Sequence, residues 1–425
     1  MKGINQLLKG GAGAAALAAG LLGAGSALAA DLTILTSWTN GDARRPALDR
    51  MVEAFKAKTG LTIDVQASAN EGGAIASIYE TALLANKEPD LVLASLEGKM
   101  NDWAKDKAVV PAGDLLKDWN LSATIPAEAI ADWTDSAGNV VGLPYLQFTW
   151  PWWYNMDRLK EAGITKVPET TDELIADAKA LRAAGIDPVI IGGSDWSGQK
   201  MLLQIIQSFM SPDEARKVFV NGGWCANPNA MKGLELFTHL RDEGVFVDDV
   251  QGLTANDSAS SFVSGDAAIT SMGSWSYKDG DTMTANVVLA GFPTVEGGTY
   301  KLPTSYAAAT LSGWYVSPAG AKKLDTLSQF IKFAYEPDQI ASLMDHTGAI
   351  PVVPVDPAVA GEKSGSATMA KSFSELPGKV DLAVMPDIWV PGSVSEALYR
   401  AVTVVFTAGV PAKEACAALD GAYGK

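Results

Sequence analysis

The chain has 425 residues, of which 48% are hydrophobic and 19% are charged. This is the composition of a folded protein with enough apolar material for two or three domains. It carries 33 basic against 49 acidic side chains, a formal net charge of −16. A surface this acidic repels nucleic acid and anionic lipid, so we expect no nucleic-acid partner.

The first 29 residues have the three parts of a cleavable signal peptide. Lys2 and Lys9 supply a positive start, and residues 10–30 are Gly, Ala, Leu and a single Ser, with a small-x-small motif at 27–29. A permanent membrane anchor is the alternative, but Gly and Ala bury too little apolar area to hold a helix firmly in a bilayer. We therefore expect a secreted, periplasmic protein. No cysteine lies near the cleavage motif, so a lipid anchor is not expected.

The two cysteines, Cys225 and Cys416, leave two readings open. In an oxidising compartment they can form one disulfide. Two separate buried thiols fit equally well, because free cysteine packs as a small hydrophobic residue.

The chain after residue 30 begins with alternating strands and helices. A buried strand starts at Leu32 and runs into a polar loop that reaches Asp42, and the helix that follows ends at Gly60, a left-handed cap. Its apolar face consists of Leu48, Met51, Val52 and Phe55. The alternation continues with a strand at 61–67, a helix around 75–83 and a strand at 89–95. This order is typical of a parallel sheet covered by helices on both faces.

The same pattern starts again near residue 150. Thr170 and Glu173 fit a capping box, the helix that they open ends at Gly185, and a buried strand follows at 187–193. Later segments with α/β or helical spacing are 262–275, 328–344 and 395–409. Two α/β units in one chain predict two lobes with a cleft between them, and such clefts are common ligand sites.

The sequence offers little material for catalysis. It has only two histidines, at 239 and 346, and it lacks the G-x-S-x-G, H-E-x-x-H, Cys-x-x-Cys and P-loop motifs. We expect no enzyme activity, no metal and no cofactor. A glycosidase pair of carboxylates remains the alternative, because such a pair depends on separation in space and not on a motif.

Twelve tryptophans are present, and several follow predicted strands. An indole can cover the C–H face of a sugar ring while neighbouring polar groups bind the hydroxyl rim. Trp38, Trp196 and Trp275 lie where open α/β sheets bind their ligands, so we expect them to contact a ligand. Asn40, Asp42 and Arg44 near Trp38, and Asp195 beside Trp196, are the polar candidates. Such a surface predicts a binding protein for a sugar-like molecule.

Other tryptophans have a structural interpretation. Trp103, Trp119 and Trp133 belong to helical segments and are expected to pack in the interior. In the group formed by Trp150, Trp152 and Trp153, strand geometry places residues 150 and 152 on one face and 153 on the other, so at most two can face a cleft.

Six segments, in this order, resemble the extracellular solute-binding proteins of carbohydrate ABC transporters, the maltose-type family 1. They are residues 55–65, 88–95, 140–164, 169–193, 262–275 and 330–353. The resemblance implies a two-lobed α/β fold of the type II periplasmic kind, in which each lobe is a mostly parallel sheet flanked by helices. It places three crossovers near 145–149, 291–295 and 348–352. The first lobe is then 30–146 plus 294–348, and the second 147–293 plus 349–425.

The resemblance also implies ligand contacts from the loop after the first strand, from Glu97 and from Trp275. Two departures argue against a maltodextrin ligand: Ala43 precedes Arg44, and Gln147 with Phe148 replaces an acid near the first crossover. The complete expected binding set is Trp38, Asn40, Asp42, Arg44, Glu97, Tyr145, Gln147, Trp152, Asp195, Trp196, Trp275, Trp314, His346 and Trp389.

The same resemblance implies partners and a mechanism. We expect a monomer that captures a sugar or polyol by hinge closure and delivers it to inner-membrane permease subunits served by cytoplasmic ATPases. A sensor that feeds a membrane receptor is an alternative output. The ligand could be a monosaccharide, a disaccharide, a polyol or a glycoside.

Overall fold

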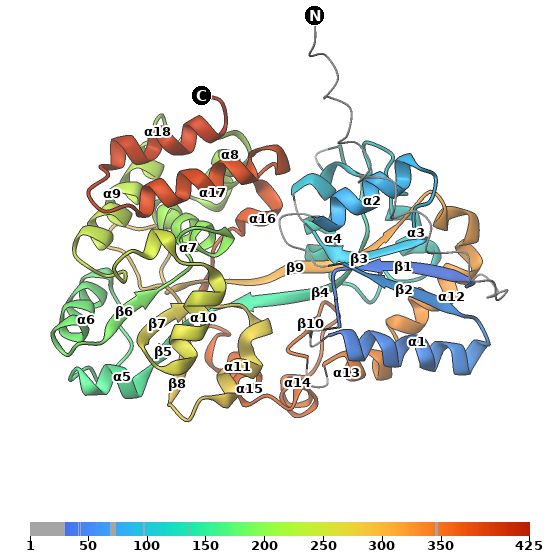
Figure 1. The fold of residues 1–425 in the computed structure, drawn as a ribbon, viewed down its shortest axis with the longest axis horizontal. Helices are drawn as coiled ribbons and strands as arrows, with labels where there is room; N and C mark the ends of the chain where they lie inside the picture. Colours follow the sequence, from blue (N-terminus) through green and yellow to red (C-terminus); the bar gives the residue numbers. More distant parts are fainter. Residues whose placement is uncertain are drawn as a thin grey trace, which may run out of the picture.

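The computed structural model describes residues 30–40, 42, 44–68, 74–96, 98–135, 137–344 and 347–425. The predicted signal peptide and two predicted site residues, Glu97 and His346, lie outside this part of the chain. Figure 1 shows two lobes side by side, joined by long strands. Within the described residues, no helix combines the length and apolar character that a membrane span requires.

Lobe 1 contains the larger sheet, whose strand order is β10-β4-β9-β3-β1-β2, with β11 paired to β9. β1 pairs in parallel with both β2 and β3. The elements of this lobe are β1 (Leu32–Thr36), α1 (Arg45–Thr59), β2 (Ile63–Ala67), α2 (Ala74–Leu84), β3 (Leu91–Ser95), the 3-10 helix η2 (Gly98–Asp102), α3 (Gly113–Asp118), α4 (Ala127–Asp132), the 3-10 helix η6 (Gly320–Lys323), α12 (Leu324–Ala334) and α13 (Pro337–Met344).

Helix α1 shows how the sequence builds this lobe. The four apolar residues predicted for its inner face are all buried, and Phe55 packs edge-on against Phe330 of α12 with ring centroids 5.3 Å apart. Gly60 ends the helix at φ 79°, a conformation that costs glycine little, and its N–H donates to the carbonyl of Lys56. The amphipathic pattern thus fixes which side of α1 faces the sheet.

Lobe 2 is built on a four-stranded sheet in the order β6-β7-β5-β8. Its elements are β5 (Trp152–Asn155), α5 (Met156–Glu161), α6 (Thr171–Ala183), β6 (Asp187–Ile190), α7 (Trp196–Ile206), η3 (Gln207–Phe209), α8 (Pro212–Asn221), α9 (Pro228–Asp242), η4 (Val250–Gly252), α10 (Ala255–Ser264), β7 (Ala267–Ser271), η5 (Ser274–Ser276), α11 (Tyr277–Thr282), β8 (Val287–Ala290), α14 (Pro357–Ser364), α15 (Ala367–Glu375), α16 (Pro386–Trp389), α17 (Gly392–Phe406) and α18 (Ala412–Ala422). The Thr170 hydroxyl caps α6 as predicted, but the Glu173 carboxylate accepts from the N–H of Glu169.

Two long strands carry the chain between the lobes, β4 (Leu143–Trp150) and β9 (Thr304–Val316), which pair antiparallel (Figure 1). The end of β9 pairs with β3 of lobe 1, whereas at its start the Tyr306 hydroxyl donates to the carbonyl of Lys200 in lobe 2. The second crossing therefore runs along β9. It comes later in the chain than the predicted segment 291–295, where Thr294 still bridges to Thr170 within lobe 2.

The third connection includes β10 (Ile350–Pro351), which pairs antiparallel with β4 at Gln147 and Leu146. It falls within the segment 348–352 that the sequence singles out. β11 (Asp381–Leu382) pairs in parallel with β9. Both sheets are mixed, because β4, β9 and β10 pair antiparallel in the larger sheet and β5 pairs antiparallel with β7 and β8 in lobe 2. The expectation of mostly parallel sheets therefore fails here. In lobe 2 only β6 and β7 pair in parallel among the described strands.

Two further features differ from, or add to, the sequence interpretation. The helical segment expected at 328–344 is two helices, because Pro337 lacks an N–H and starts α13 after α12 has ended.

Cys225 and Cys416 form a disulfide, which ties the loop before α9 to the terminal helix α18. The sequence left open one disulfide or two separate buried thiols, and the structure contains the disulfide.

Candidate ligand-binding site

Four aromatic side chains gather where the crossing strands enter lobe 2. Phe148 and Trp150 come from β4, Trp196 from the start of α7, and Trp275 from η5, and we call these four the interlobe aromatic cluster. The Trp150 ring lies 5.2 Å from both Trp196 and Trp275, and Phe148 lies 5.6 Å from Trp275, measured between centroids. The cluster therefore sits on a strand that links the two lobes.

The members of the cluster differ in exposure. Phe148 and Trp150 are buried, and the Trp150 indole N–H donates to the Ser271 hydroxyl. Trp196 and Trp275 are only partly buried. An indole that packs on one face and is open on the other presents a flat apolar surface, which is the part a sugar ring can cover.

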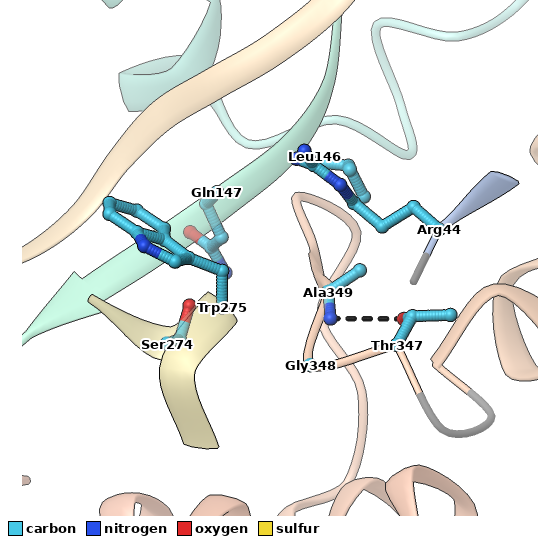
Figure 2. A pocket seen from close by; sticks show the side chains of 8 residues that line it. All are labelled: Arg44, Leu146, Gln147, Ser274, Trp275, Thr347, Gly348 and Ala349. Carbon is cyan, nitrogen blue, oxygen red and sulfur yellow. Dashed lines mark hydrogen bonds between the residues drawn. The ribbon is translucent and has the colours of Figure 1, made fainter. Parts of the chain in front are cut away.

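A pocket opens beside Trp275 and is lined by both lobes and by two crossings. Its lining residues are Arg44, Leu146, Gln147, Ser274, Trp275, Thr347, Gly348 and Ala349. In Figure 2, Trp275 and Arg44 lie on opposite sides of the pocket, with β4 behind them. The space between the lining atoms is about 250 Å³ with open solvent included, but only about 10 Å³ of it can take the centre of a water-sized molecule.

A cavity of about 10 Å³ on this measure holds about one water molecule, so a sugar ring does not fit into it as it stands. The lobes also touch away from the crossings: α16 and α17 of lobe 2 lie beside η2 of lobe 1. The structure therefore shows the lobes close together, and a ligand larger than the pocket needs them to separate before it can enter.

Lobe 1 contributes Arg44 to the pocket, and Asp42 holds this arginine in an ion pair. The Arg44 guanidinium donates to the Asp42 carboxylate at 2.6 Å and lies 5.1 Å from the centre of the Trp38 ring. Burial raises the pKa of Asp42, but hydrogen bonds from Arg44 and its positive charge outweigh burial, so this pKa lies below its ordinary value. Trp38 itself is buried in the core of lobe 1, so Arg44 separates it from the pocket.

Gln147 connects the pocket to the crossings. Its side-chain amide donates to the Pro351 carbonyl at 3.0 Å, and its backbone pairs with Ile350 in β10. Two residues further on, the Thr149 hydroxyl bonds the hydroxyl of Tyr277 in lobe 2 at 2.5 Å. Contact with a ligand at Gln147 would thus act directly on the segments that join the lobes.

An ion pair with a buried lysine and a partly exposed aspartate lies against the aromatic cluster. The Lys200 ammonium donates to both carboxylate oxygens of Asp387, at 2.6 and 2.8 Å. It also stands over two indoles, 4.9 Å from the centre of Trp196 and 5.2 Å from that of Trp150. Cation–π attraction and the carboxylate together hold the lysine in place.

Other residues of the expected binding set lie in the interior of one lobe. Tyr145 and Trp314 are fully buried in lobe 1, with ring centroids 5.3 Å apart. The Tyr145 hydroxyl donates to the Ala334 carbonyl, and burial raises its pKa far above the ordinary value. Trp152 is fully buried in lobe 2, where its N–H donates to the Gln204 side chain. The structure does not bring these three to the pocket.

Asp195 and Trp389 lie in lobe 2 with structural partners. Asp195 caps α7: one carboxylate oxygen accepts from the N–H and hydroxyl of Ser197, and the other accepts from the N–H of Ala255 at 2.7 Å. Trp389 packs against the core of lobe 2, and Arg216 lies 5.4 Å from its ring centre.

Asn40 is exposed in the loop after β1. Of the fourteen expected residues, Arg44, Gln147 and Trp275 line the pocket, Trp196 joins the cluster, and Asp42 pairs with Arg44. Lys200, Asp387 and Thr347 were missed. Only Thr347 had a local signal, because it directly precedes the predicted third crossover.

The profile of the bacterial extracellular solute-binding protein family matches residues 40–341. The chain belongs to this family. A solved structure of a probable secreted solute-binding lipoprotein from Streptomyces coelicolor is 34% identical, with a TM-score of 0.82, over 93% of this chain and 99% of that one. The resemblance carried by the six segments is therefore confirmed, and so is the two-lobed α/β fold.

More distant relatives agree. Proteins named probable sugar-binding periplasmic protein, from Brucella suis and Rhizobium meliloti, are 25% and 26% identical. The matches cover 63% and 61% of this chain and only 63% and 62% of those proteins. A structure of a chitin oligosaccharide binding protein has a TM-score of 0.74 at 21% identity over 93% of this chain and 99% of that one, which shows a shared fold alone.

Proposed function

We propose that this solute-binding protein captures a sugar or sugar-like molecule between its lobes and serves as the binding component of an ABC uptake transporter. The observation that carries the proposal is the placement of Trp196 and Trp275. Their partly buried indoles both pack against Trp150 of β4, a strand that joins the lobes, and Trp275 lines a pocket that residues of both lobes form. Sugar-binding names among the relatives support the same ligand class.

Hinge closure follows from this placement. A ligand that touches Arg44 of lobe 1 and Trp275 of lobe 2 at once makes more contacts when the lobes are together, so it shifts the population toward the closed state. The crossings at Gln147 and β9 would take up the change in angle. The closed form would then be the state that a membrane permease recognises.

Several finer points belong to the same proposal. The protein would act in the periplasm, as a monomer, and without chemistry on its ligand. It would diffuse freely without a lipid anchor, since the two cysteines of the sequence are bonded to each other. A sensor that signals to a membrane receptor would use the same site, and a partner permease would distinguish the two outputs.

A ligand screen tests the proposal. Thermal shift and then titration calorimetry would use glucose, xylose, mannitol, maltose, raffinose, diacetylchitobiose and xylobiose, with choline as a cationic comparison. A sugar or polyol should raise the melting temperature, because ligands that bind only the folded state stabilise it. If choline binds and no sugar or polyol does, the proposed ligand class is wrong. Intact sugar after long incubation would exclude hydrolysis.

A further inference from the structure

We infer that Asp387, held by Lys200, is a specificity-determining residue that accepts hydrogen bonds from two neighbouring hydroxyls of the ligand. This inference rests on the proposed function and extends it. Neither residue lines the pocket beside Trp275, but Lys200 lies over Trp150 and Trp196, so the ion pair adjoins the same aromatic cluster as the pocket does.

The exposures of the two partners differ in the way that a binding carboxylate requires. The Lys200 side chain is 6% exposed, whereas that of Asp387 is 25% exposed. The indoles of Trp150 and Trp196 thus cover the Lys200 ammonium, while solvent still reaches the Asp387 carboxylate. A pair that served packing alone would have no need to leave its acidic member open.

Asp387 also has acceptor capacity to spare. A carboxylate offers about four lone-pair sites. Among the hydrogen bonds of the described residues, those to Asp387 both come from Lys200. Two acceptor sites therefore remain, one on each oxygen, which suits hydroxyls on adjacent carbon atoms.

Position and charge fit the same role. Asp387 lies on α16, which approaches η2 of lobe 1, so a ligand held there would lie at the interlobe contact. Because Lys200 neutralises the carboxylate, the site carries no net charge from this pair. The ligand class that it fits is a neutral polyhydroxyl compound with an apolar ring face for the indoles and a pair of adjacent hydroxyls for Asp387.

Two variants and one control test the inference by calorimetry. Asp387→Asn keeps the shape but removes the ionised acceptor. The double variant Lys200→Met with Asp387→Asn removes both charges, so no buried lysine is left unpaired if the single variant is unstable. Glu243→Gln is the matched control, because Glu243 forms an ion pair with Lys179 elsewhere in lobe 2.

The probes are each sugar or polyol of the screen that the wild type binds, together with forms that lack one hydroxyl. We expect both Asp387 variants to bind at least tenfold more weakly and the control to stay within twofold. In the wild type, loss of either of two adjacent hydroxyls should weaken binding at least tenfold, and in Asp387→Asn the same losses should have little effect.

The outcomes separate this inference from the proposed function. If the wild type binds no sugar or polyol, the proposed function fails first. If the wild type binds one and both Asp387 variants bind it equally well, only the present inference is overturned, and the ion pair is structural. The inference is also overturned if the affinity of the wild type falls by the same factor for every deoxygenated form, whichever hydroxyl is missing.

Discussion

Replacement of Trp275 by Ala should weaken sugar binding strongly at a modest cost in stability. An indole buries about 150–250 Å² when fully covered, and Trp275 already packs one side against the interlobe aromatic cluster. Roughly 100 Å² is then left for a ligand to cover. At about 25 cal/mol per Å² this corresponds to about 2.5 kcal/mol, or roughly 70-fold in Kd.

Trp314 is the matched comparison, since it is also a tryptophan expected at the site but lies fully buried in lobe 1. Trp314→Ala should cost about 3–5 kcal/mol of stability through the cavity that it leaves. Its affinity for the sugar, measured where the variant is folded, should stay near that of the wild type. Calorimetric titration gives the affinities, and urea unfolding gives the stabilities.

The two variants should therefore show opposite profiles. The reasoning is refuted if Trp275→Ala binds its sugar as tightly as the wild type but loses as much stability as Trp314→Ala. That result would make Trp275 a core residue whose exposed face has no ligand.

Three other perturbations have defined outcomes. Reduction of the Cys225–Cys416 disulfide should lower the melting temperature, and the loss of chain entropy sets an upper limit of about 5 kcal/mol on the stability lost for a loop of this length. Sugar affinity should stay within about threefold. An unchanged melting temperature would contradict this expectation. Because the pKa of Asp42 is lowered, its carboxylate stabilises the folded state above the ordinary value of 3.8, and this contribution disappears as the pH falls through the lowered pKa. The stability gap between the wild type and Arg44→Gln should thus shrink in acid, and a gap that is constant from pH 7 to 3 would argue against the pair. Small-angle X-ray scattering should show a more compact molecule once a bound sugar is added, and identical profiles would refute hinge closure.

Local patterns were sufficient to predict much of the framework. The apolar stripe of α1, the left-handed end at Gly60 and the Thr170 cap all depend on neighbours within a few residues, and the structure has each of them. The positions where strands cross between the lobes were harder to predict, because the path of β9 depends on pairing with β3 and β4, which lie far away in the sequence.

The same reason explains the uneven result at the site. Trp196 and Trp275 follow glycine-containing strand ends, and the sequence identified them from that position. The inward direction of Trp314 depends on the partners of β9, which no local pattern reveals. Lys200 and Asp387 are 187 residues apart, and their contact exists only once α7 and α16 have folded against each other.

A crystal structure of the complex with a sugar from the screen would test the central claim most directly. The account predicts a ring stacked on Trp275, in contact with Arg44 or Gln147 on one side and near Asp387 on the other. A sugar bound on the surface of a single lobe, with the interlobe pocket empty, would contradict it.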